Sequence, residues 1–421
     1  MKVLVIGAGG REHALAWQCA KFDNIDRVYV APGNAGTKLE NKVTNIDIDS
    51  EDIDSLAKFA IQNDIDLTIV GPEAPLVIGI VDSFQDKGLT IFGPTASASQ
   101  LEGSKAFCKD FLERNNIPTA YYGVFTDKDS AINYIKEKGT PIVIKADGLA
   151  AGKGVIIANN EEEAITAIND MLEGNRFGEA GSRVVIEEFL IGEEASFIVM
   201  VDGKNILPMA TSQDHKARDN GDKGPNTGGM GAYSPAPIVT DQIFQNVIDT
   251  IIRPTVDSMS DEGNTYTGFL YAGLMIDKEG NSKVLEYNCR FGDPETQPIM
   301  MRLKSNLAEL CFLASKGRLD EAKVEWDDRV ALGVVLAADG YPDSYLSGEK
   351  IKLPPDSQDG KVFHAGTKIE NGNVVSSGGR VLCATALGTS TENAQANAYN
   401  LADKINWKGS YYRTDIGFKA I

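Results

Sequence analysis

The sequence predicts an α/β and α+β protein of several domains that begins with a doubly wound parallel sheet. Over the first 116 residues, short apolar runs alternate with helical patterns, and the runs end in glycine or proline, as in VLVIG, RVYVAPG, DLTIVGPE and TIFGPT. This alternation is typical of βαβ units, which build parallel sheets. A chain of 421 residues is also too long for one hydrophobic core. We therefore expect about two to four domains.

Composition and charge exclude several classes of protein. Hydrophobic residues make up 42% of the chain and charged residues 24%, which is ordinary for a globular protein. The formal net charge of -19 argues against a nucleic-acid-binding surface, although local basic pockets could still bind phosphates. No apolar run approaches the roughly 20 residues that a membrane span needs.

Targeting signals and cysteines point to the cytoplasm. The opening segment KVLVIGAGG is too short and too rich in glycine for a signal peptide, so we interpret it as a first buried strand. The five cysteines are widely spaced and form no CxxC pair, which favours neither a zinc site nor a disulfide framework. Reduced thiols in a cytoplasmic protein are the simplest interpretation.

The chain divides into four predicted parts. Their boundaries are residues 1–116, 117–189, 190–328 and 329–421. The second part holds a glycine loop, two helical patterns and the strand RVVIEEFL. The third holds the strands SFIVMVDG, GFLYAGLMID and KVLEYNC, interrupted by a long loop over 214–237. The last has strand-like runs ALGVVLAA, KVFHAG and RVLCATALG, followed by a helix over 391–404.

The first strand leads into the glycine turn GAGGREHA. A dinucleotide-binding fingerprint would place its third glycine where Glu12 stands, and no acidic residue closes the second strand. The sequence therefore disfavours a nicotinamide cofactor. Gly9, Gly10 and Arg11 still combine backbone donors and a cation at a helix N-terminus, which suits a phosphate ester. The alternative is that these glycines only form tight turns.

A second glycine-rich segment, PIVIKADGLAAGKGVIIA, is predicted to be a strand, a loop and another strand. Lys145 ends the first strand, and Gly148, Gly152 and Gly154 break up the loop. Glycines let backbone N–H groups approach phosphate oxygens, and the lysine adds positive charge. No Gly-Lys-Ser/Thr opens a helix here, so this is not a Walker A loop. A β-hairpin with a flexible tip is the alternative.

The segment VLEYNCRFGDPETQ is the most informative in the chain. Glu286 and Asn288 lie two apart on a predicted strand, so both side chains face the same way. Two oxygen ligands on one rigid face suit a hard cation such as Mg²⁺. Arg290, Asp293 and Glu295 follow at the strand's end, where open α/β sheets place their sites. A metal carboxylate beside a fixed guanidinium is what a phosphoryl-transfer site needs. A polar strand end with a surface salt bridge is the competing interpretation.

A third segment, RVVIEEFLIGEEASF, is an apolar strand followed by acidic residues. Glu187, Glu188 and Leu190 could form a hinge whose backbone groups bind an adenine edge, and Glu194 could bind the ribose hydroxyls. By itself the segment could equally be a strand with a solvated acidic end.

Taken in order, these segments resemble the ATP-grasp superfamily, in which two α+β lobes hold ATP between them. The superfamily's order is a lysine, a second lysine, a glycine loop, an acidic hinge and metal ligands. The matching residues here are Lys105, Lys145, Gly148–Gly154, Glu187–Glu194, and Glu286 with Asn288. Within the superfamily, the motifs GAGGREHA, APGNAGT, GPEAPL, LEGSKAF, GPNTGGMGAYSP, EYNCRFGDPETQ and HAGT resemble the phosphoribosylamine–glycine ligase family over essentially the whole chain.

The resemblance implies a central two-lobed ATP-grasp fold and a small C-terminal mixed β domain. It implies ATP-dependent ligation of glycine to 5-phosphoribosylamine through glycyl phosphate, with Mg²⁺ or Mn²⁺, in purine biosynthesis. It leaves open a monomer or a dimer, and a transient contact with the preceding enzyme of the pathway. It implies no nucleic-acid or membrane partner.

The resemblance also implies roles for individual residues. Lys105 and Lys145 would neutralise ATP phosphates, and Arg290 would steady the glycine carboxylate and the acyl phosphate. Asp214 would hold the glycine ammonium, while Asp293 would act in the site or orient Arg290. The phosphoribosylamine would be bound by Gly9, Gly10, Arg11, Asn34 and Glu73. The segment from Asp214 to Pro235 would be a partly mobile, substrate-facing wall, with an exposed connector as the alternative.

Three other functions stay open. Another ATP-grasp ligase, such as a formate-using purine ligase or a biotin carboxylase, would share the ATP residues, but GGREHA and RFGDPETQ favour the glycine ligase. A non-catalytic nucleotide-binding module would bind ATP without turnover. A nicotinamide dehydrogenase would need a tight dinucleotide site, which Glu12 disfavours.

Overall fold

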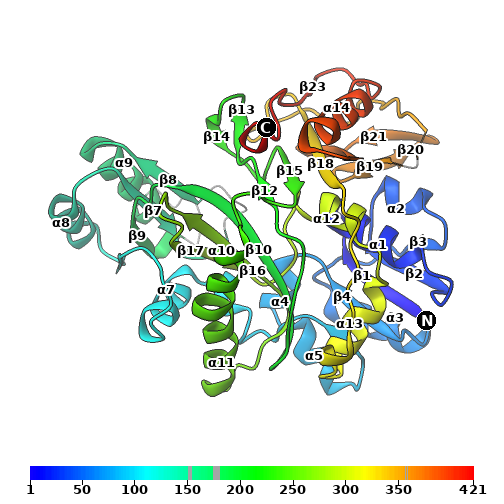
Figure 1. Ribbon diagram of the computed structural model, residues 1–421, viewed down its shortest axis with the longest axis horizontal. Helices are drawn as coiled ribbons and strands as arrows, with labels where there is room; N and C mark the ends of the chain where they lie inside the picture. Colours follow the sequence, from blue (N-terminus) through cyan, green and yellow to red (C-terminus); the bar gives the residue numbers. More distant parts are fainter. Residues whose placement is uncertain (150–153, 174–180, 356, 358) are drawn as a thin grey trace.

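The computed structural model describes residues 1–149, 154–173, 181–355, 357 and 359–421. A small lobe projects from a larger body, and the long strands β10 (Glu193–Asp202) and β16 (Thr267–Ile276) run between them (Figure 1). The predicted multidomain α/β and α+β architecture is confirmed. No helix among the described residues is long and apolar enough to cross a membrane.

The N-terminal sheet is fully parallel, as predicted, with the strand order β3-β2-β1-β4-β5. Its strands are β1 (Lys2–Gly7), β2 (Arg27–Pro32), β3 (Val43–Asn45), β4 (Leu67–Val70) and β5 (Ile91–Phe92). The helices around it are α1 (Gly10–Ala20), α2 (Ala35–Leu39), α3 (Ile53–Gln62), α4 (Glu73–Val77) and α5 (Ile80–Asp86). The helices α6 (Gln100–Gly103) and α7 (Lys105–Arg114) follow and lie toward the small lobe (Figure 1).

Successive side chains along β1 point to opposite faces of the sheet, and both faces are covered by helices. Leu4 and Ile6 belong to the buried cluster that contains residues of α3 and α5. Val3 and Val5 belong to a second cluster, with residues of α1 and of α13 (Leu307–Ser315). Because side chains two apart on a strand share a face, one strand serves both layers. One of these covering helices, α13, begins about 300 residues after the end of β1.

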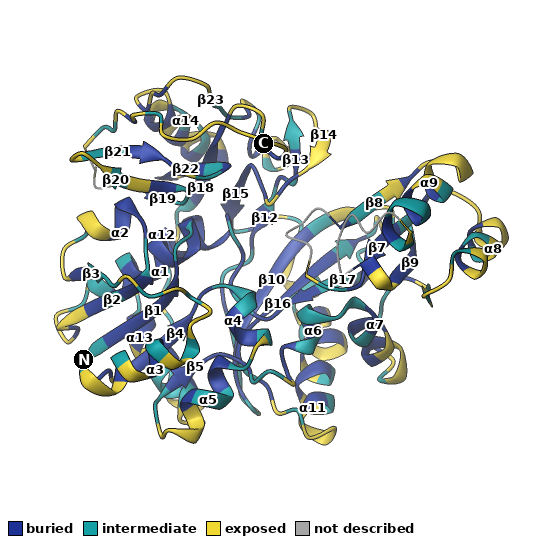
Figure 2. Ribbon diagram, turned by 180° about the vertical axis from the view of Figure 1, so that it is seen from behind, coloured by how far each residue is buried: buried dark blue, intermediate teal, exposed yellow. Residues whose placement is uncertain are grey.

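The small lobe has its own core. Its four-stranded sheet has the order β6-β9-β7-β8, from β6 (Tyr122–Phe125), β7 (Ile142–Ala146), β8 (Val155–Ala158) and β9 (Val184–Glu188). The helices α8 (Lys128–Lys138) and α9 (Glu161–Leu172) pack on it through a separate buried cluster. Figure 2 shows exposed residues concentrated on the outer parts of these helices.

The large lobe is a second four-stranded sheet with the order β11-β10-β16-β17. Here β11 is Ile206–Pro208 and β17 is Ser282–Asn288. The helices α10 (Asp241–Val247) and α11 (Arg253–Asp261) are joined by a π-helical turn, and α12 (Thr296–Arg302) follows β17. A register shift sets Gly273 opposite Glu286 and Leu274 opposite Val284. This bulge therefore falls beside the predicted metal ligands.

The C-terminal domain is a mixed β unit, as predicted. Its sheet has the order β12-β15-β18-β22-β19, with β23 beside β18. These strands are β12 (Gln213–Asp214), β15 (Gly231–Ser234), β18 (Val330–Ala338), β19 (Gly360–His364), β22 (Arg380–Gly388) and β23 (Ser410–Tyr411). The helix α14 (Thr391–Ala402) covers it, and β20 (Thr367–Glu370) pairs with β21 (Asn373–Ser376).

The prediction of one long loop over 214–237 was wrong. The segment contains β12 and β15, which join the C-terminal sheet, and the hairpin of β13 (Ala217–Asp219) and β14 (Lys223–Asn226). β15 is glycine-rich and short, and it pairs with β18, about 100 residues later in the chain. Backbone pairing with so distant a strand leaves no local signal in the sequence.

Candidate functional site

A cavity of about 500 Å³ lies where the two central lobes meet the N-terminal and C-terminal domains. Many of the predicted site residues line it: Arg11, Glu73, Lys105, Lys145, Gly154, Glu187, Glu188, Leu190, Glu194, Asp214, Glu286, Asn288, Arg290 and Asp293. Gly9, Gly10, Asn34 and Gly148 are not among its lining residues, and Gly152 lies outside the described residues. The chain thus brings together groups from four domains.

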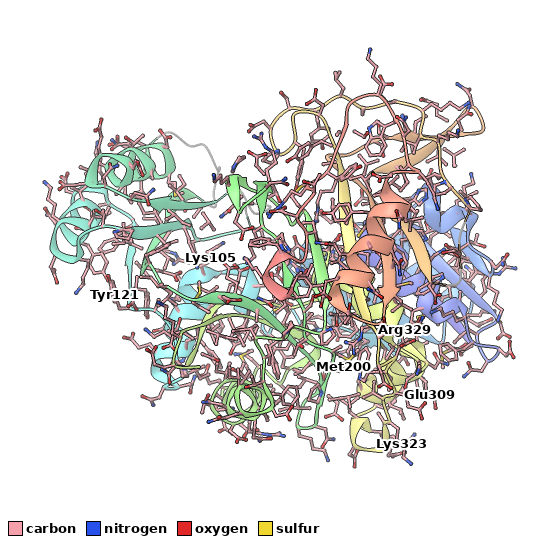
Figure 3. The ribbon with its side chains drawn as sticks, turned by 45° about the horizontal axis from the view of Figure 1, so that its top comes forward. Lys105, Tyr121, Met200, Glu309, Lys323 and Arg329 are labelled. Atoms are coloured by element: carbon pink, nitrogen blue, oxygen red, sulfur yellow. The ribbon has the colours of Figure 1, made fainter. Side chains whose placement is uncertain are left out.

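Lysines dominate one end of the cavity. Lys105 opens α7 where the small lobe joins the body (Figure 3), and its Nζ donates to the carbonyl oxygen of Gly148 at 3.0 Å. Lys145 is the last residue but one of β7 and lies 3.0 Å from Glu187 Oε1, while Lys109 lies 3.1 Å from Glu187 Oε2. Although burial opposes ionisation, Lys145 and Lys109 lower the pKa of Glu187. One buried carboxylate therefore fixes two ammonium groups beside the glycine loop.

The hinge segment follows Glu187 along the same wall. Glu188 and Leu190 line the cavity, and Lys283 of the neighbouring strand lies 3.2 Å from the Glu188 carboxylate. Glu194 pairs with Lys216 Nζ at 2.9 Å. The Glu188 side chain of the small lobe thus pairs with a lysine of the large lobe.

The predicted metal ligands lie on β17, facing the cavity. Burial opposes ionisation of Glu286, but Lys216, Lys145 and Lys105 lower its pKa, so it stays a carboxylate. In the described part of the chain, no cluster of three or more His, Cys, Asp or Glu side chains forms a metal cage. Two protein oxygens fit Mg²⁺, which usually completes its shell with water and substrate phosphates. The donor set therefore fits a nucleotide-bound divalent cation.

Arginines dominate the other end of the cavity. Arg290 Nη2 lies 2.9 Å from Glu102 Oε1, and its Nε lies 3.3 Å from Glu73 Oε2. Burial raises the pKa of Glu102 to about 7, whereas Arg290 and Arg11 lower the pKa of Glu73 to about 2 against the effect of burial. Arg290 Nη1 also donates to the carbonyl oxygen of Phe291 at 3.3 Å. Two hydrogen bonds and the ion pair with Glu102 thus hold the guanidinium on the cavity wall.

Asp293 does not pair with Arg290, the alternative considered for it. Its carboxylate lies 3.6 Å from Arg380 Nη2, and its backbone oxygen accepts a bond of 2.6 Å from Arg380 Nη1. Gln297 donates to the same carboxylate at 2.8 Å. Despite burial, Arg380 and Arg11 lower the pKa of Asp293. Asp293 therefore fixes an arginine that comes from the C-terminal domain.

Between the two ends lies a carboxylate-rich wall. Burial, together with Glu295 and Glu194, raises the pKa of Asp214 to about 8, although Lys216 opposes the rise. Glu295 Oε1 accepts bonds of 3.0 Å from the hydroxyls of Ser196 and Tyr271. An ammonium group placed here would relieve the repulsion between neighbouring carboxylates.

The first glycine turn is packed by Glu12. Its carboxylate accepts from the backbone N–H of Gly9 at 2.6 Å and pairs with the Arg11 guanidinium. A Cβ atom on Gly71 would lie only 2.1 Å from Glu12 Oε1, so glycine is required for this approach. The turn thus accommodates a buried carboxylate where a dinucleotide phosphate would sit.

Asn34 caps a helix in this structure. Its Oδ1 accepts from Thr37 N–H at 3.1 Å, and its Nδ2 donates to the carbonyl oxygens of Ala8 and His364, each at 2.8 Å. The side chain therefore ties the glycine turn to the C-terminal domain. Its contact with a substrate stays a prediction.

The lining residues not predicted from the sequence include Glu102, Lys109, Tyr271 and Arg380. Lys109 carries a usable signal, because it lies four residues after Lys105 and hence on the same face of a helix. Glu102 and Arg380 carry no local signal, since their partners are 188 and 87 residues away. Tyr271 is hidden within an apolar strand.

Comparisons with known proteins agree with the geometry. Three domain profiles of phosphoribosylglycinamide synthetase match: the N domain over residues 1–102, the ATP-grasp (A) domain over 103–296 and the C domain over 331–419. Phosphoribosylamine–glycine ligases of Salmonella typhimurium and Yersinia pestis are 65% and 63% identical, each alignment covering 100% of this chain and 99% of the relative.

Solved structures give the same family and a wider fold group. A phosphoribosylamine–glycine ligase from Thermotoga maritima superposes with a TM-score of 0.87 at 35% identity, covering 99% of this chain and 100% of the other. A biotin carboxylase from Campylobacter jejuni has a TM-score of 0.76 at 14% identity, covering 99% and 94%. The second likeness concerns the fold alone.

Proposed function

The chain belongs to the phosphoribosylglycinamide synthetase family, a family of ATP-dependent ligases, and on this premise we propose that it joins glycine to 5-phosphoribosylamine through glycyl phosphate. The products are glycinamide ribonucleotide, ADP and phosphate, in purine biosynthesis. The observation that carries the proposal is a single cavity with a lysine-rich end for ATP and an arginine-rich end for two further anionic substrates. We place the reaction in the cytoplasm.

In the first step, a glycine carboxylate oxygen attacks the γ-phosphorus of ATP and ADP leaves. The attacking and leaving groups are both anionic, so fixed cations and in-line positioning supply most of the catalysis. Lys105 and Lys145 are placed to neutralise the phosphates. A Mg²⁺ or Mn²⁺ ion held by Glu286 and Asn288 would add charge neutralisation across the phosphates.

In the second step, the amine of phosphoribosylamine attacks the glycyl carbonyl carbon, loses a proton and expels phosphate. Arg290 lines the cavity, and its planar fork suits a bidentate contact with the glycine carboxylate before the first step or with the acyl phosphate after it. Asp214 and Glu295 would hold the glycine ammonium. Because an acyl phosphate hydrolyses readily, the wall around Asp214 must also exclude water.

The division of labour follows the predicted domains. Residues 1–116 would bind phosphoribosylamine, with Arg11 and Glu73 nearest the cavity. Residues 117–189 and 190–328 would enclose ATP, and 329–421 would close the substrate end through Arg380 and Tyr341, which both line the cavity. A C-terminal domain that contributes lining residues makes the site depend on all four parts.

The test is ADP release with Mg²⁺, ATP, glycine and freshly generated phosphoribosylamine, each omitted in turn. Turnover that requires both glycine and phosphoribosylamine, with glycinamide ribonucleotide identified by mass spectrometry, is expected. Turnover that proceeds with bicarbonate or formate in place of glycine would instead assign the site to another ATP-grasp reaction.

A further inference from the structure

The hairpin of β13 and β14 connects directly to the catalytic cavity. Lys216 lies immediately before β13 and lines the cavity, as do Asn226 at the end of β14 and Gly228 beyond it. The Lys216 carbonyl oxygen accepts from the backbone N–H of Thr227 at 2.8 Å and from its hydroxyl at 2.9 Å. Movement of the hairpin would therefore shift Lys216, which lies two residues after Asp214.

Residues near the C-terminus form hydrogen bonds with this hairpin. Arg413 is fully buried, and its Nη1 donates to the carbonyl oxygen of Ala217 at 3.0 Å and to Asp222 Oδ1 at 2.8 Å. Its Nε and Nη2 donate to the two oxygens of Asp415 at 2.8 and 2.9 Å. Asp415 in turn accepts from the backbone N–H of Gly221 at 2.7 Å. One guanidinium thus joins the start of the hairpin to its turn.

Further hydrogen bonds join the C-terminal residues to the hairpin and to the residues just before it. Asn220 exchanges two hydrogen bonds with Thr414, at 2.6 and 3.0 Å. The Tyr411 hydroxyl donates to the carbonyl oxygen of Arg218 at 3.0 Å. The backbone N–H of Gly417 donates to Nε2 of His215, the residue between Asp214 and Lys216, at 3.2 Å. Every one of these contacts spans more than 190 residues of sequence.

We propose that the segment from Tyr411 to Lys419 is a clamp that positions the wall of Asp214 and Lys216, with Arg413 as its central positioning residue. The inference rests on the proposed function and adds a role in retaining glycyl phosphate. Buried arginine contacts to carbonyl and carboxylate groups have a defined geometry, so the clamp specifies a position rather than only adding stability. A displaced wall admits water, which hydrolyses the acyl phosphate back to glycine and phosphate.

The experiment compares Arg413→Met and Arg413→Lys with the unaltered enzyme. Three quantities are measured: ADP formed per glycinamide ribonucleotide formed, KM for glycine and KM for ATP. In Arg413→Met, misplacement of the wall is expected to raise the ADP-to-product ratio about threefold and the glycine KM about tenfold. The ATP KM should stay within about twofold, because Arg413 touches no ATP-end lysine. Arg413→Lys should bring the ADP-to-product ratio part of the way back toward one.

Arg329→Met is the matched control. Arg329 also bridges two aspartates in the C-terminal region, at 2.8 Å from Asp327 and 2.7 Å from Asp359, but it contacts neither the hairpin nor the cavity. It should leave the ADP-to-product ratio at one. A folded Arg413→Met enzyme that keeps a ratio of one and an unchanged glycine KM would overturn the clamp.

A second variant covers the case in which Arg413→Met does not fold. Asp415→Asn preserves shape but removes one of the two charges that fix Arg413, so it should shift the same ratio in the same direction by a smaller factor. An ADP-to-product ratio of one in folded Asp415→Asn would then overturn the clamp. The proposed ligase activity is judged separately, by glycine-dependent turnover of the unaltered enzyme.

Discussion

The two ends of the cavity use different cations in different ways. At the lysine-rich end, Lys105, Lys109 and Lys145 come from one helix and one strand, and two of them share Glu187. At the other end, Arg290 and Arg380 are held by carboxylates and carbonyl groups from other domains. Lysines act as compact charges for phosphates, whereas arginines recognise planar anions through paired bonds.

The difference suggests which parts of the fold would bind which substrate. The lysine end is assembled from α7 and the adjacent small lobe, with one bond from Lys145 to the carbonyl oxygen of Leu285 in the large lobe, so it suits a nucleotide that many ligases share. The arginine end exists only when the N-terminal, central and C-terminal parts have packed together. Changes at the first end should therefore affect ATP, and changes at the second should affect glycine and phosphoribosylamine.

The largest effect is expected from Glu286→Ala, because both ends depend on the phosphate charge being neutralised. Loss of this carboxylate should lower kcat by about 10³-fold or more while the melting temperature changes little. Glu279→Ala, an exposed acid before the same strand, is the control. Steady-state ADP release and thermal melting measure the two quantities. Near-normal turnover of Glu286→Ala would contradict the metal assignment.

Arg290→Lys tests whether the arginine end needs the planar guanidinium group of arginine or only a positive charge. An ammonium group cannot span Glu73 and Glu102 and still present two donors to substrate, so kcat should fall about 10²-fold. The ATP KM should remain near its normal value. Arg318→Lys, which changes an exposed arginine paired with Glu321, is the control. A large rise in the ATP KM would show that the two ends are not separate.

Lys145→Met sharpens the comparison from the lysine end. Removing this charge should raise the ATP KM by roughly tens of fold, since one phosphate contact and one partner of Glu187 are lost. The glycine KM should change far less. Initial rates with each substrate varied in turn give both constants, and Lys136→Met, an exposed lysine in α8, is the control. Equal changes in both constants would contradict the division.

The smallest effect is a pH dependence of glycine binding. The pKa of Asp214 is raised to about 8 by burial and neighbouring carboxylates, so the group is mostly neutral below that pH. Only the carboxylate attracts an ammonium, and the glycine KM should therefore rise about tenfold as pH falls from about 9 to about 7. The KM is calculated for the ammonium form of glycine. Asp214→Asn should flatten the profile, and a flat profile in the unaltered enzyme would exclude this role.

Much of the fold was predictable because its signals are local. The parallel N-terminal sheet, the strand of Glu286 and Asn288, and the helix after residue 390 follow from apolar periodicity and glycine turns. The loop predicted over 214–237 failed, because β12, β13, β14 and β15 have only two to four residues each and β15 pairs with the distant β18. β3 also escaped prediction, since Val43 is its only apolar residue.

The sequence by itself determined the architecture, the order of the ATP-site groups and the family. Those features reside in short motifs whose residues are neighbours along the chain. Only the tertiary structure decided that Asp293 holds Arg380, that Glu102 and Glu73 hold Arg290, and that Arg413 grips the hairpin. The physical reason is that buried charges find their partners by packing across domains, and no local periodicity encodes a contact between residues hundreds of positions apart.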